Sequence, residues 1–220
     1  MSITIYQMAH SPFCIPITQA LTATGTAFET REIPNWDRSE ILRLTGGAYY
    51  QVPVLIHDGK MILESSSDSQ DIAHYVDATF AAGALFPERF DGLQAIVNDF
   101  LENEVEILTF RLVDIHWIES IEDVAARGMV LRHKERKFGR GCVEKWKRDA
   151  EAIRADADRL LERFEITLRH SSFLFGDKPV YADFLLFGIL GNLTYRNYNQ
   201  LNPNQTALEK WVEAMREFRF

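Results

Sequence analysis

A serine and a cysteine stand close together near the N-terminus, in the run His10-Ser-Pro-Phe-Cys14 that follows a short β-like stretch. If a helix begins here, its unpaired N–H groups and positive dipole end would stabilise a thiolate placed at its start. Ser11 could donate a hydrogen bond to such a thiolate, and Cys14 could itself act as a redox thiol. Ser11 followed by Pro12 is also a common helix start without chemistry, and Pro16 indicates that the helix starts irregularly.

A proline lies inside the second candidate motif, Gln51-Val52-Pro53-Val54, which otherwise has the composition of a strand. Proline cannot donate a hydrogen bond to a neighbouring strand, so one interpretation is an edge strand. The alternative is a cis Val52–Pro53 peptide bond that turns the backbone of Val52 outward. There it could pair with an extended peptide ligand, as an added strand does.

Acidic and hydroxyl side chains gather in the third motif, which runs from Glu64 through Asp68, Ser69 and Gln70 to Asp71. Asp68 or Ser69 can cap the helix that follows, and this role needs no ligand. The same geometry can bind a ligand carboxylate through exposed N–H groups and a hydroxyl, while a nearby acidic side chain binds an ammonium group. Both interpretations remain open.

The chain around these motifs alternates strand-like and helix-like patterns, which is typical of an α/β unit. The turn at Asp58-Gly59 favours a hairpin, because glycine tolerates the positive φ of tight hairpin turns. We expect strands at 3–8, 28–33, 52–56 and 61–63, and helices at 12–24, 37–44 and 69–76.

Beyond residue 78 the patterns become helical, after a linker at 79–90. Asp91 is a suitable N-cap for a long helix towards Ile118. The clearest periodicity is an apolar stripe from Val143 to Leu168 with steps of three and four residues, which predicts one long helix. Further helices are expected at 181–193 and 206–217. The predicted domains are therefore 1–78 and an all-helical 91–220.

The 220-residue chain carries a formal charge of −8, and its pI is near 5.3. Nucleic acids and anionic membranes bind basic surfaces, so neither is an expected partner. The most apolar run, 184–193, is far shorter than the roughly 20 residues of a membrane span, and residues 1–8 lack the features of a secretory signal. Two cysteines without zinc-ligand spacing argue against a disulfide scaffold and a metal site, and they favour a reducing cytoplasm.

In their order and spacing, the three motifs and the helical region behind them resemble a cytosolic glutathione transferase over nearly the whole chain. The resemblance implies an α/β thioredoxin-like N-terminal domain plus an all-α C-terminal domain, with glutathione as co-substrate and no metal. Ser11-Pro-Phe is similar to the motif of serine-type members, whose hydroxyl donates a hydrogen bond to the glutathione thiolate. By the same resemblance, Val52 before cis Pro53 would pair with the cysteinyl backbone, and Gln51 would lie near the glycine carboxylate.

The resemblance assigns the γ-glutamyl end of glutathione to an acidic-Ser pair that opens the third helix. Family members commonly place this pair eleven residues after the cis-proline, which in this sequence is Glu64-Ser65. We predict Asp68-Ser69 instead, because the apolar residues that follow then fall at the family's third-helix positions. Four additional residues would loop out before the helix.

A second departure from the family concerns the core helix expected at 181–193. Members have a Ser or Thr capping box at its start, which aligns here with Val180-Tyr-Ala-Asp183. Val180 has no hydroxyl, whereas Asp183 can still accept a hydrogen bond from a backbone N–H. The missing hydroxyl should cost about 1 kcal/mol of local stability.

The pocket for a second substrate is implied by location alone, since the family forms it from the early helices of the second domain. The candidates are Phe100, Glu104, Leu108, Arg111 and Trp117. The basic segment 132–140 could attract an anionic substrate, although we favour a solvated helix end for it.

The resulting hypothesis is a glutathione S-transferase that activates the glutathione thiol through Ser11 for attack on a small electrophilic or hydrophobic molecule. The alternatives are a thiol–disulfide oxidoreductase that uses Cys14, and a non-catalytic glutathione-binding or regulatory protein on the same fold. We also expect a homodimer, from the resemblance and because Tyr49 and Tyr50 are costly to leave exposed.

Overall fold

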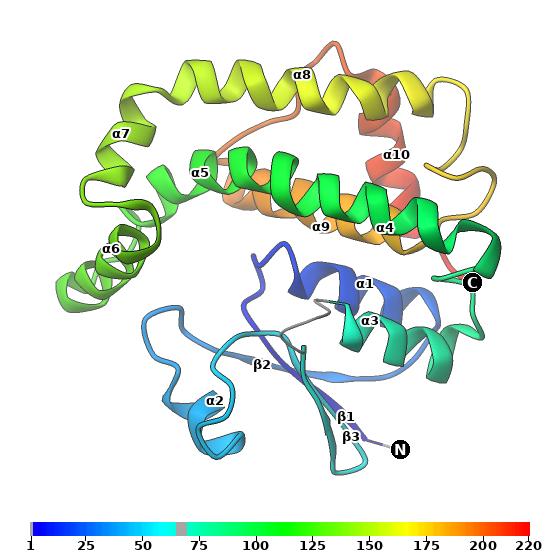
Figure 1. Cartoon of the computed structure of the whole chain (residues 1–220), viewed down its shortest axis with the longest axis horizontal. Coiled ribbons are helices and arrows are strands. Elements are labelled where there is room, and N and C mark those ends of the chain that lie inside the picture. The colour runs from blue at the N-terminus through cyan, green and yellow to red at the C-terminus, as the bar shows by residue number, and fades with distance from the viewer. Residues whose placement is uncertain (1, 65–69) are drawn as a thin grey trace.

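The molecule has two parts, a small sheet with its helices and a larger all-helical part (Figure 1). The computed structural model describes residues 2–64 and 70–220. In the view of Figure 1 the strands lie at the bottom, and the long helices of the second part lie above them.

The described residues of the first part form a four-stranded sheet flanked by helices. Its elements are β1 (Ile3–Gln7), α1 (Cys14–Ala23), β2 (Glu29–Glu32), α2 (Ser39–Leu44), β3 (Val54–His57), β4 (Lys60–Ile62), α3 (Asp71–Val76) and the π-helical turn η1 (Asp77–Ala81).

The strand order of the sheet is β2-β1-β3-β4. Strands β1 and β2 are parallel, and the other two pairs are antiparallel. Successive side chains of a strand point to opposite faces. Ile5 therefore packs into the core shared with α1 and α3, whereas Tyr6 packs on the other face against Ile41 of α2.

Two local predictions about this sheet are confirmed. Asp58 and Gly59 have φ angles of 47° and 81° in the hairpin between β3 and β4. The Val52–Pro53 peptide bond is cis. The edge-strand interpretation of Pro53 is wrong, because β3 pairs with β1 on one side and with β4 on the other.

The second part is built from helices, and α9 and α10 have the bounds that the sequence predicts. Its elements are η2 (Glu88–Phe90), α4 (Asp91–Phe100), the π-helical turn η3 (Leu101–Val105), α5 (Glu106–Trp117), α6 (Val124–Phe138), α7 (Cys142–Arg148), α8 (Ala150–Leu168), α9 (Tyr181–Leu193), η4 (Tyr195–Asn197) and α10 (Thr206–Glu217). Within the described chain, no helix combines the length and apolar composition that crossing a membrane requires.

The helix predicted from Asp91 towards Ile118 is a continuous helical run of α4, η3 and α5. Asp91 is not its N-cap, because the turn η2 precedes it and Phe90 occupies that position. As the first helical residue, Asp91 still places its negative charge near the positive end of the helix dipole.

The apolar stripe predicted as one helix is divided between α7 and α8 at Asp149, where φ is −94° and ψ is 7°. Aspartate offers its backbone competing side-chain hydrogen bonds, which favours such breaks. The N–H of Asp149 still donates to Lys145, and its carbonyl accepts from Ile153, so the stripe keeps facing the core. Its buried members are Val143, Trp146, Ile153, Ala157, Phe164 and Leu168.

The connection between the two parts begins later than the predicted boundary at residue 78, because the helical run of α3 and η1 continues to Ala81. Asp77 of η1 is buried. Its carboxylate accepts hydrogen bonds from the N–H groups of Leu85 at 2.8 Å and Phe86 at 3.2 Å. These bonds fix the start of the connection to the first part.

Helix α9 is the buried centre of the second part, and it packs directly against α1 of the first part. Gly188 makes this approach possible, because a Cβ atom there would lie 2.4 Å from the carbonyl oxygen of Pro12 and 2.6 Å from Cδ of Pro16. One turn along α9, the side-chain N–H of Asn192 donates to the carbonyl of His10 at 2.6 Å. The start of α1 is therefore held by the helical part.

The start of α9 is organised by Asp183, which is fully buried. Its carboxylate accepts from the N–H of Val180 at 3.0 Å, which confirms the predicted half of the capping box. It also accepts from the N–H of Leu174 at 2.9 Å and from Nε1 of Trp211 at 3.1 Å. Burial raises the pKa of Asp183 to about 6, and these hydrogen bonds oppose the rise.

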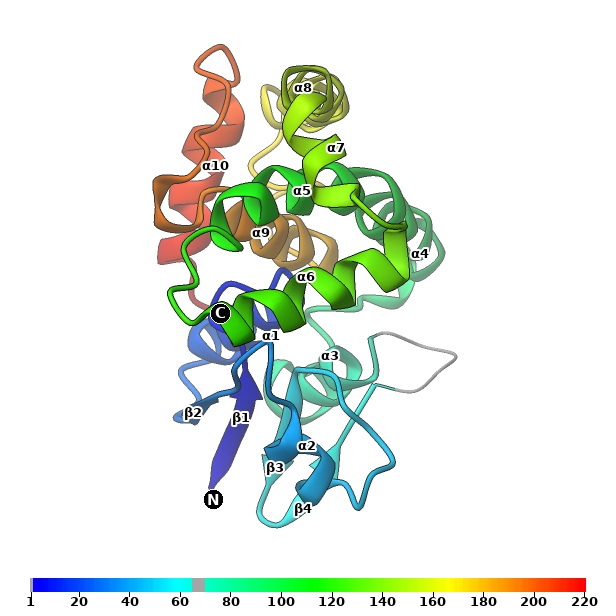
Figure 2. The same cartoon turned by 90° about the vertical axis from the view of Figure 1, so that its left-hand side faces the viewer.

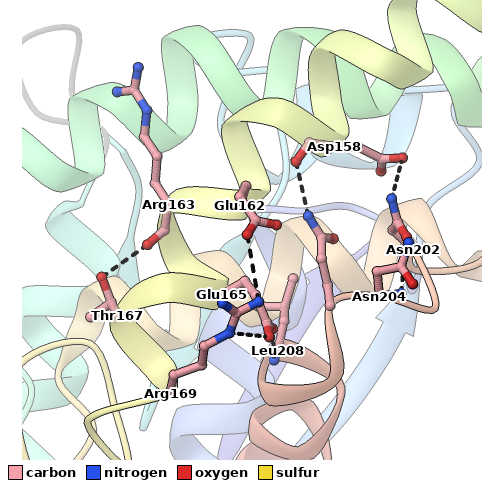
Figure 3. A network of polar contacts seen from close by, with 10 residues as sticks. Asp158, Glu162, Arg163, Glu165, Thr167, Arg169, Asn202, Asn204 and Leu208 are labelled. Atoms are coloured by element: carbon pink, nitrogen blue, oxygen red, sulfur yellow. Dashed lines mark hydrogen bonds and ion pairs between the residues drawn. The ribbon is translucent and has the colours of Figure 1, made fainter.

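A polar network attaches α10 and the segment before it to α8 (Figure 3). The buried carboxylate of Glu165 accepts from the N–H of Leu208 at 2.8 Å and from Nε of Arg169 at 3.1 Å. Asp158, two turns earlier on α8, accepts from Nδ2 of Asn202 at 3.1 Å. The last helix is thus fixed by hydrogen bonds as well as by its apolar face.

Replacing Gly188 by alanine should destabilise the protein, because the added Cβ would overlap the carbonyl of Pro12 and the ring of Pro16. Overpacking a core costs about 1–3 kcal/mol, which exceeds the roughly 1 kcal/mol that alanine gains over glycine in a helix. After this gain is subtracted, we expect Gly188→Ala to lower the free energy of unfolding by about 1 kcal/mol in a urea titration.

Gly191→Ala is the matched control on the same helix. The nearest atom to its added Cβ would be Cδ1 of Ile15 at 3.1 Å, the end of a side chain that can rotate away. This variant should stay within about 0.5 kcal/mol of the parent protein. Equal unfolding midpoints for the two variants would contradict the proposed close contact at Gly188.

Candidate active site

Ser11 lies in the turn between β1 and α1 and is only 4% exposed. Its carbonyl accepts from the N–H groups of Cys14 and Ile15, both at 3.1 Å. The regular helix begins at Cys14, after Phe13, but Ser11 makes the two contacts of a helix N-cap, through its carbonyl and through its Oγ, so the capping interpretation of Ser11 is supported. The N–H of Phe13 donates to Oγ of Ser11 at 3.3 Å, which leaves the hydroxyl its own proton to donate.

Cys14 is the first residue of α1 and has no exposed surface. Burial raises the pKa of its thiol to about 11, and a hydrogen bond with Ser11 opposes the rise. The thiol is therefore protonated at neutral pH and has no access to solvent. Because the helix begins at Cys14, Pro16 falls in the first turn, where an N–H has no helical partner, which confirms the irregular start.

A cavity of about 560 Å³ lies beside the cis peptide bond. Gln51, Val52 and Pro53, the residues predicted from the second motif, line it together. Glu64 at the end of the β4 segment and Glu102 of the π-helical turn η3 also line it. The cavity thus brings a polar loop and two carboxyl groups next to one another.

Of the two acidic-Ser pairs considered for the third motif, only Glu64 belongs to the described residues. Ser65, Asp68 and Ser69 lie outside them. Glu64 lines the cavity of the cis peptide bond.

A second cavity of about 530 Å³ contains Ser11 together with Gln51 and Val52. It shares Phe13, Tyr50, Gln51 and Val52 with the first cavity, so the two adjoin. The first and second sequence motifs therefore meet in one cleft, although about forty residues separate them along the chain.

A third cavity of about 450 Å³ extends from Ser11 in the direction of α5 and α6. Its walls include the aromatic rings of Phe110 and Phe138, whose centroids are 5.3 Å apart. Gln51 and Val52 are not among its lining residues. Ser11 therefore lines both the second cavity, which contains Gln51 and Val52, and the third cavity, which contains Phe110 and Phe138.

Helix α6 crosses the side of the molecule where the two parts meet (Figure 2). His133, Lys134 and Lys137 of this helix line both cavities at Ser11, because the crossing turns one face of α6 to the cleft. His133 and Lys137 are nevertheless exposed, so the solvated interpretation of the basic segment holds for them. Nζ of Lys134 forms an ion pair of 2.5 Å with the buried carboxylate of Asp114 on α5.

Glu106 at the start of α5 also lines both cavities at Ser11. Burial raises the pKa of its carboxyl to about 7, although Lys134 and Lys137 oppose the rise. Among the described residues, none forms a hydrogen bond with this carboxyl, although the charges of Lys134 and Lys137 act on it. A carboxyl of this kind changes charge near neutral pH, which is common at functional sites.

The imidazole of His10 is packed between aromatic rings, 4.9 Å from Trp117 and 5.1 Å from Tyr195 between centroids. Burial, with nearby cations, lowers the pKa of His10 to about 4, so the ring is neutral. Among the described residues, no group of three or more His, Cys, Asp or Glu side chains is arranged to hold a metal ion. His10 therefore acts as an aromatic wall of the third cavity.

The five residues predicted for the second-substrate pocket do not line these three cavities. The helix face turned to the cleft instead carries Glu102, Glu106, Phe110 and Asp114. Phe100, Glu104 and Leu108 each stand two residues before one of these positions, which is about 200° around a helix and close to the opposite face. Of the predicted residues, Phe100 packs on Phe164, and Leu108 and Trp117 belong to the hydrophobic core. Arg111 lies beside the rings of Phe110 and Trp146, and Glu104 is exposed.

Sequence reasoning also missed Arg38, Glu106 and His10 as lining residues. Glu106, Phe110 and Asp114 recur every four residues, and this spacing is the signal that could have identified them. Arg38 has no such signal, because it reaches the cleft from the segment before α2.

Two family models match the chain. The glutathione S-transferase N-terminal domain matches residues 5–84, and the glutathione S-transferase C-terminal domain matches residues 111–217. The first match contains the turn of Ser11 and the loop of Val52, and the second contains most of α5 and all of α6.

Curated relatives match shorter stretches. A probable glutathione S-transferase from Nicotiana tabacum is 32% identical over 111 residues, which are 44% of this chain and 48% of that protein. Glutathione S-transferase U28 from Arabidopsis thaliana is 36% identical over 76 residues, which are 34% of this chain and 32% of that protein. The chain thus spans about half of the length of the tobacco relative.

Solved structures share the fold over the whole length. Glutathione transferase GSTFuA3 from Phanerochaete chrysosporium has a TM-score of 0.79 at 17% identity, covering 100% of this chain and 98% of its own. A theta class glutathione S-transferase from Xanthomonas axonopodis pv. citri, solved with glutathione bound, has a TM-score of 0.65 at 16% identity, covering 98% and 93%. With both of its parts matched by glutathione S-transferase domains, the chain belongs to the glutathione S-transferase family.

Proposed function

We propose that this chain is a glutathione transferase that binds glutathione along the loop before β3 and stabilises its thiolate through the hydroxyl of Ser11. The observation that carries the proposal is that Ser11, Gln51 and Val52 line one cavity of about 530 Å³. This volume suits a small ligand.

Glutathione is a short peptide, and the loop before β3 offers backbone for an extended peptide. The ladder between β1 and β3 begins at Val54, so the backbone of Val52 lies outside it. In the proposal, Val52 pairs with the cysteinyl unit, as an added strand does. Gln51 contacts the glycine carboxylate, and an acidic side chain binds the γ-glutamyl ammonium group.

The proposed reaction forms one bond and breaks one. Oγ of Ser11 donates its hydrogen bond to sulfur, which favours the thiolate over the thiol and releases the thiol proton to water. The thiolate sulfur then forms a bond with the electrophilic carbon of the second substrate, and the leaving group departs with its bonding electron pair. The helix start at Cys14 adds its positive dipole end to the stabilisation.

Thiol–disulfide exchange through Cys14 has less support. The nucleophile in that chemistry is a thiolate with access to the disulfide. The sulfur of Cys14 is buried, and its pKa is raised to about 11. Both cysteines are free and buried, which fits the reducing cytoplasm that we propose as the compartment.

Ser11→Ala should lower the rate of glutathione conjugation to chlorodinitrobenzene by tenfold or more, while Cys14→Ala leaves it nearly unchanged. Losing a hydrogen bond to a charged sulfur costs about 1.5–3 kcal/mol. An increase of about 1.4 kcal/mol in the activation free energy lowers the rate tenfold. Steady-state kinetics measure the effect, and stabilisation of each variant by glutathione in thermal unfolding verifies that the binding site is intact.

The opposite pattern would assign the protein to the thiol-transfer enzymes. In that case Cys14→Ala would abolish activity and Ser11→Ala would not. Mass spectrometry after incubation with oxidised glutathione gives an independent readout, because thiol transfer requires a mixed disulfide on Cys14.

The acidic contact to the γ-glutamyl ammonium group can be identified by two isosteric variants. We propose Glu64, since it lines the cavity of Val52 and Pro53. Glutathione at 100 times its dissociation constant should stabilise the parent protein by about 2.7 kcal/mol. Glu64→Gln should lose more of this stabilisation than Asp68→Asn. The reverse ranking would support the Asp68-Ser69 pair favoured by the helix register.

We also propose a homodimer. The residues that support it are not the two tyrosines on which the sequence argument rested. Tyr49 packs inside its own part of the molecule, and Tyr50, which is 52% exposed, lines the cleft. Leu93 and Ile96 of α4, however, are 57% and 69% exposed, and large apolar surface of this kind favours association. We expect the mass of a dimer by light scattering at micromolar concentration, and a monomeric mass would refute it.

A further inference from the structure

Ser11 and Glu106 belong to different parts of the molecule, and both line the second and the third cavity. Ser11 lies in the turn between β1 and α1, and Glu106 is the first residue of α5. Among the described walls, Glu106 is the acidic residue that the two cavities share, because Glu102 and Asp114 line the third cavity but not the second. A molecule in these cavities can therefore contact the hydroxyl of Ser11 and the carboxyl of Glu106 at once.

We propose that Glu106 is a catalytic acid, which donates its proton to the carbonyl oxygen of an α,β-unsaturated carbonyl compound while the glutathione thiolate attacks the β-carbon. This inference rests on the proposed function of the cleft. It adds the class of electrophile, a conjugated carbonyl compound, and a residue of the helical part that takes part in the reaction.

The π-helical turn η3 positions Glu106 at the cleft. The backbone N–H of Glu106 donates to the carbonyl of Leu101, five residues earlier, which is the bond that defines a π-helical turn. Single turns of this kind within α-helices occur frequently at functional sites. Phe110 and Asp114 follow Glu106 at steps of four residues, so this face of α5 is turned to the third cavity.

The carboxyl of Glu106 is available to a substrate. It forms no hydrogen bond or ion pair with any residue in 2–64 and 70–220. The carboxylate of Asp114, by contrast, is engaged in its ion pair of 2.5 Å with Lys134. Glu106 is half-buried in the wall of the two cavities. It can therefore donate to a substrate without breaking a contact within the protein.

Two effects favour the protonated form of Glu106 near neutral pH. Burial raises the pKa of its carboxyl to about 7, although Lys134 and Lys137 oppose the rise. In the proposed complex, the glutathione thiolate adds a second negative charge to the same cavity, and like charges disfavour ionisation of the carboxyl. The form that can donate a proton is therefore favoured when glutathione is bound.

The walls of the third cavity suit a planar conjugated molecule. The rings of Phe110 and Phe138 line this cavity with centroids 5.3 Å apart, and the ring of His10 lines it as well. An aryl-substituted enone is planar and can pack its ring on these side chains. Phe110 lies about one helical turn after Glu106, so a ring packed on Phe110 has its polar substituent near the carboxyl.

Conjugate addition creates the charge that a protonated carboxyl can neutralise. The sulfur lone pair forms the new bond to the β-carbon, and the electrons of the C=C bond shift towards the carbonyl oxygen. The proton of Glu106 passes to that oxygen, and the resulting enol rearranges to the ketone in water. The carboxylate then takes up from water the equivalent of the proton that the thiol released. Positioned general acids accelerate steps of this kind by about 10²–10⁴-fold.

The test compares phenylbutenone, a planar aryl enone, with chlorodinitrobenzene at saturating glutathione. In the reaction of chlorodinitrobenzene the nitro groups carry the charge and chloride leaves with the electron pair, so no proton enters the product. Glu106→Gln keeps the size of the side chain but has no acidic proton. It should lower kcat/KM for the enone by about tenfold or more and leave kcat/KM for chlorodinitrobenzene within about twofold.

Glu104→Gln is the matched control. Glu104 carries the same charge two residues earlier, is exposed, and lines none of the three cavities. This variant should leave kcat/KM for both substrates unchanged. Stabilisation of each variant by glutathione in thermal unfolding verifies that the fold and the glutathione site are intact.

The ratio of the two kcat/KM values, enone over chlorodinitrobenzene, should fall as the pH rises, because the charged form of Glu106 cannot donate a proton. Between pH 6.5 and pH 8.5 the ratio should fall by about fivefold or more in the parent protein and stay constant in Glu106→Gln. Ionisation of glutathione cancels in the ratio, because the thiolate is common to both reactions.

The other charged and titratable side chains that face Glu106 come from several elements. They are Lys134, Lys137 and His133 of α6, Asp114 of α5, Glu102 of η3, and His10, Arg38 and Tyr50 of the first part. The pKa of His10 is lowered to about 4 and that of His133 lies below its ordinary value, so both rings are mostly neutral in this range. Glu106→Gln retains all of these groups. A fall of the ratio that persists in this variant would therefore belong to them and would overturn the inference.

Three further outcomes are decisive. An equal loss for the two substrates in Glu106→Gln would overturn the inference and leave the proposed function intact, because the glutamate would then act on the thiol or on binding. A parent protein that conjugates chlorodinitrobenzene, with an enone reaction that is absent or unchanged by Glu106→Gln, would also overturn the inference alone. Conjugation of neither substrate would contradict the proposed function, and the inference with it.

Discussion

The close approach of α1 to α9 is the constraint on which the rest of the molecule depends. It requires a residue without a side chain at 188, because the carbonyl of Pro12 and the ring of Pro16 occupy the space that a Cβ would need. Asn192 adds a hydrogen bond to the carbonyl of His10. The turn of Ser11 belongs to the first part by sequence, but the second part fixes its position. The cleft is therefore a property of the interface between the two parts.

The polar side chains in the interior and in the cleft differ in how completely they are hydrogen-bonded. Asp183 and Glu165 each accept several hydrogen bonds from backbone and side chains, and they connect helices of the second part. Arg38 and Glu106 lack such complete partners among the described residues, and both line the cleft. Buried polar atoms without a partner also occur away from the cleft, at Asn98, Arg111 and Gln205, so a missing partner does not by itself identify a ligand site.

The sequence predicts elements well where a local pattern decides them. The bounds of α9 and α10 follow from dense apolar periodicity, and the β3–β4 turn follows from Asp58-Gly59. The walls of the cleft are less predictable, because periodicity identifies an apolar face without saying which neighbour covers it. Helix α6 crosses the cleft because of tertiary packing, and no pattern within residues 124–138 predicts this position. The acidic-Ser pair is ambiguous for a different reason, since the family's spacing after the cis-proline favours Glu64-Ser65 whereas the helix register favours Asp68-Ser69.

If the protein handles electrophiles, as proposed, the burial of Cys14 and Cys142 has a further consequence. Any exposed thiolate on such a protein would compete with its co-substrate and become alkylated. The side chains of both cysteines are at most 5% exposed, and burial raises the pKa of each thiol. Thiols that are protonated and enclosed react slowly. Burial thereby protects the folded protein from the electrophiles of the proposed reaction. Alkylation of its cysteines would then indicate that the protein has unfolded.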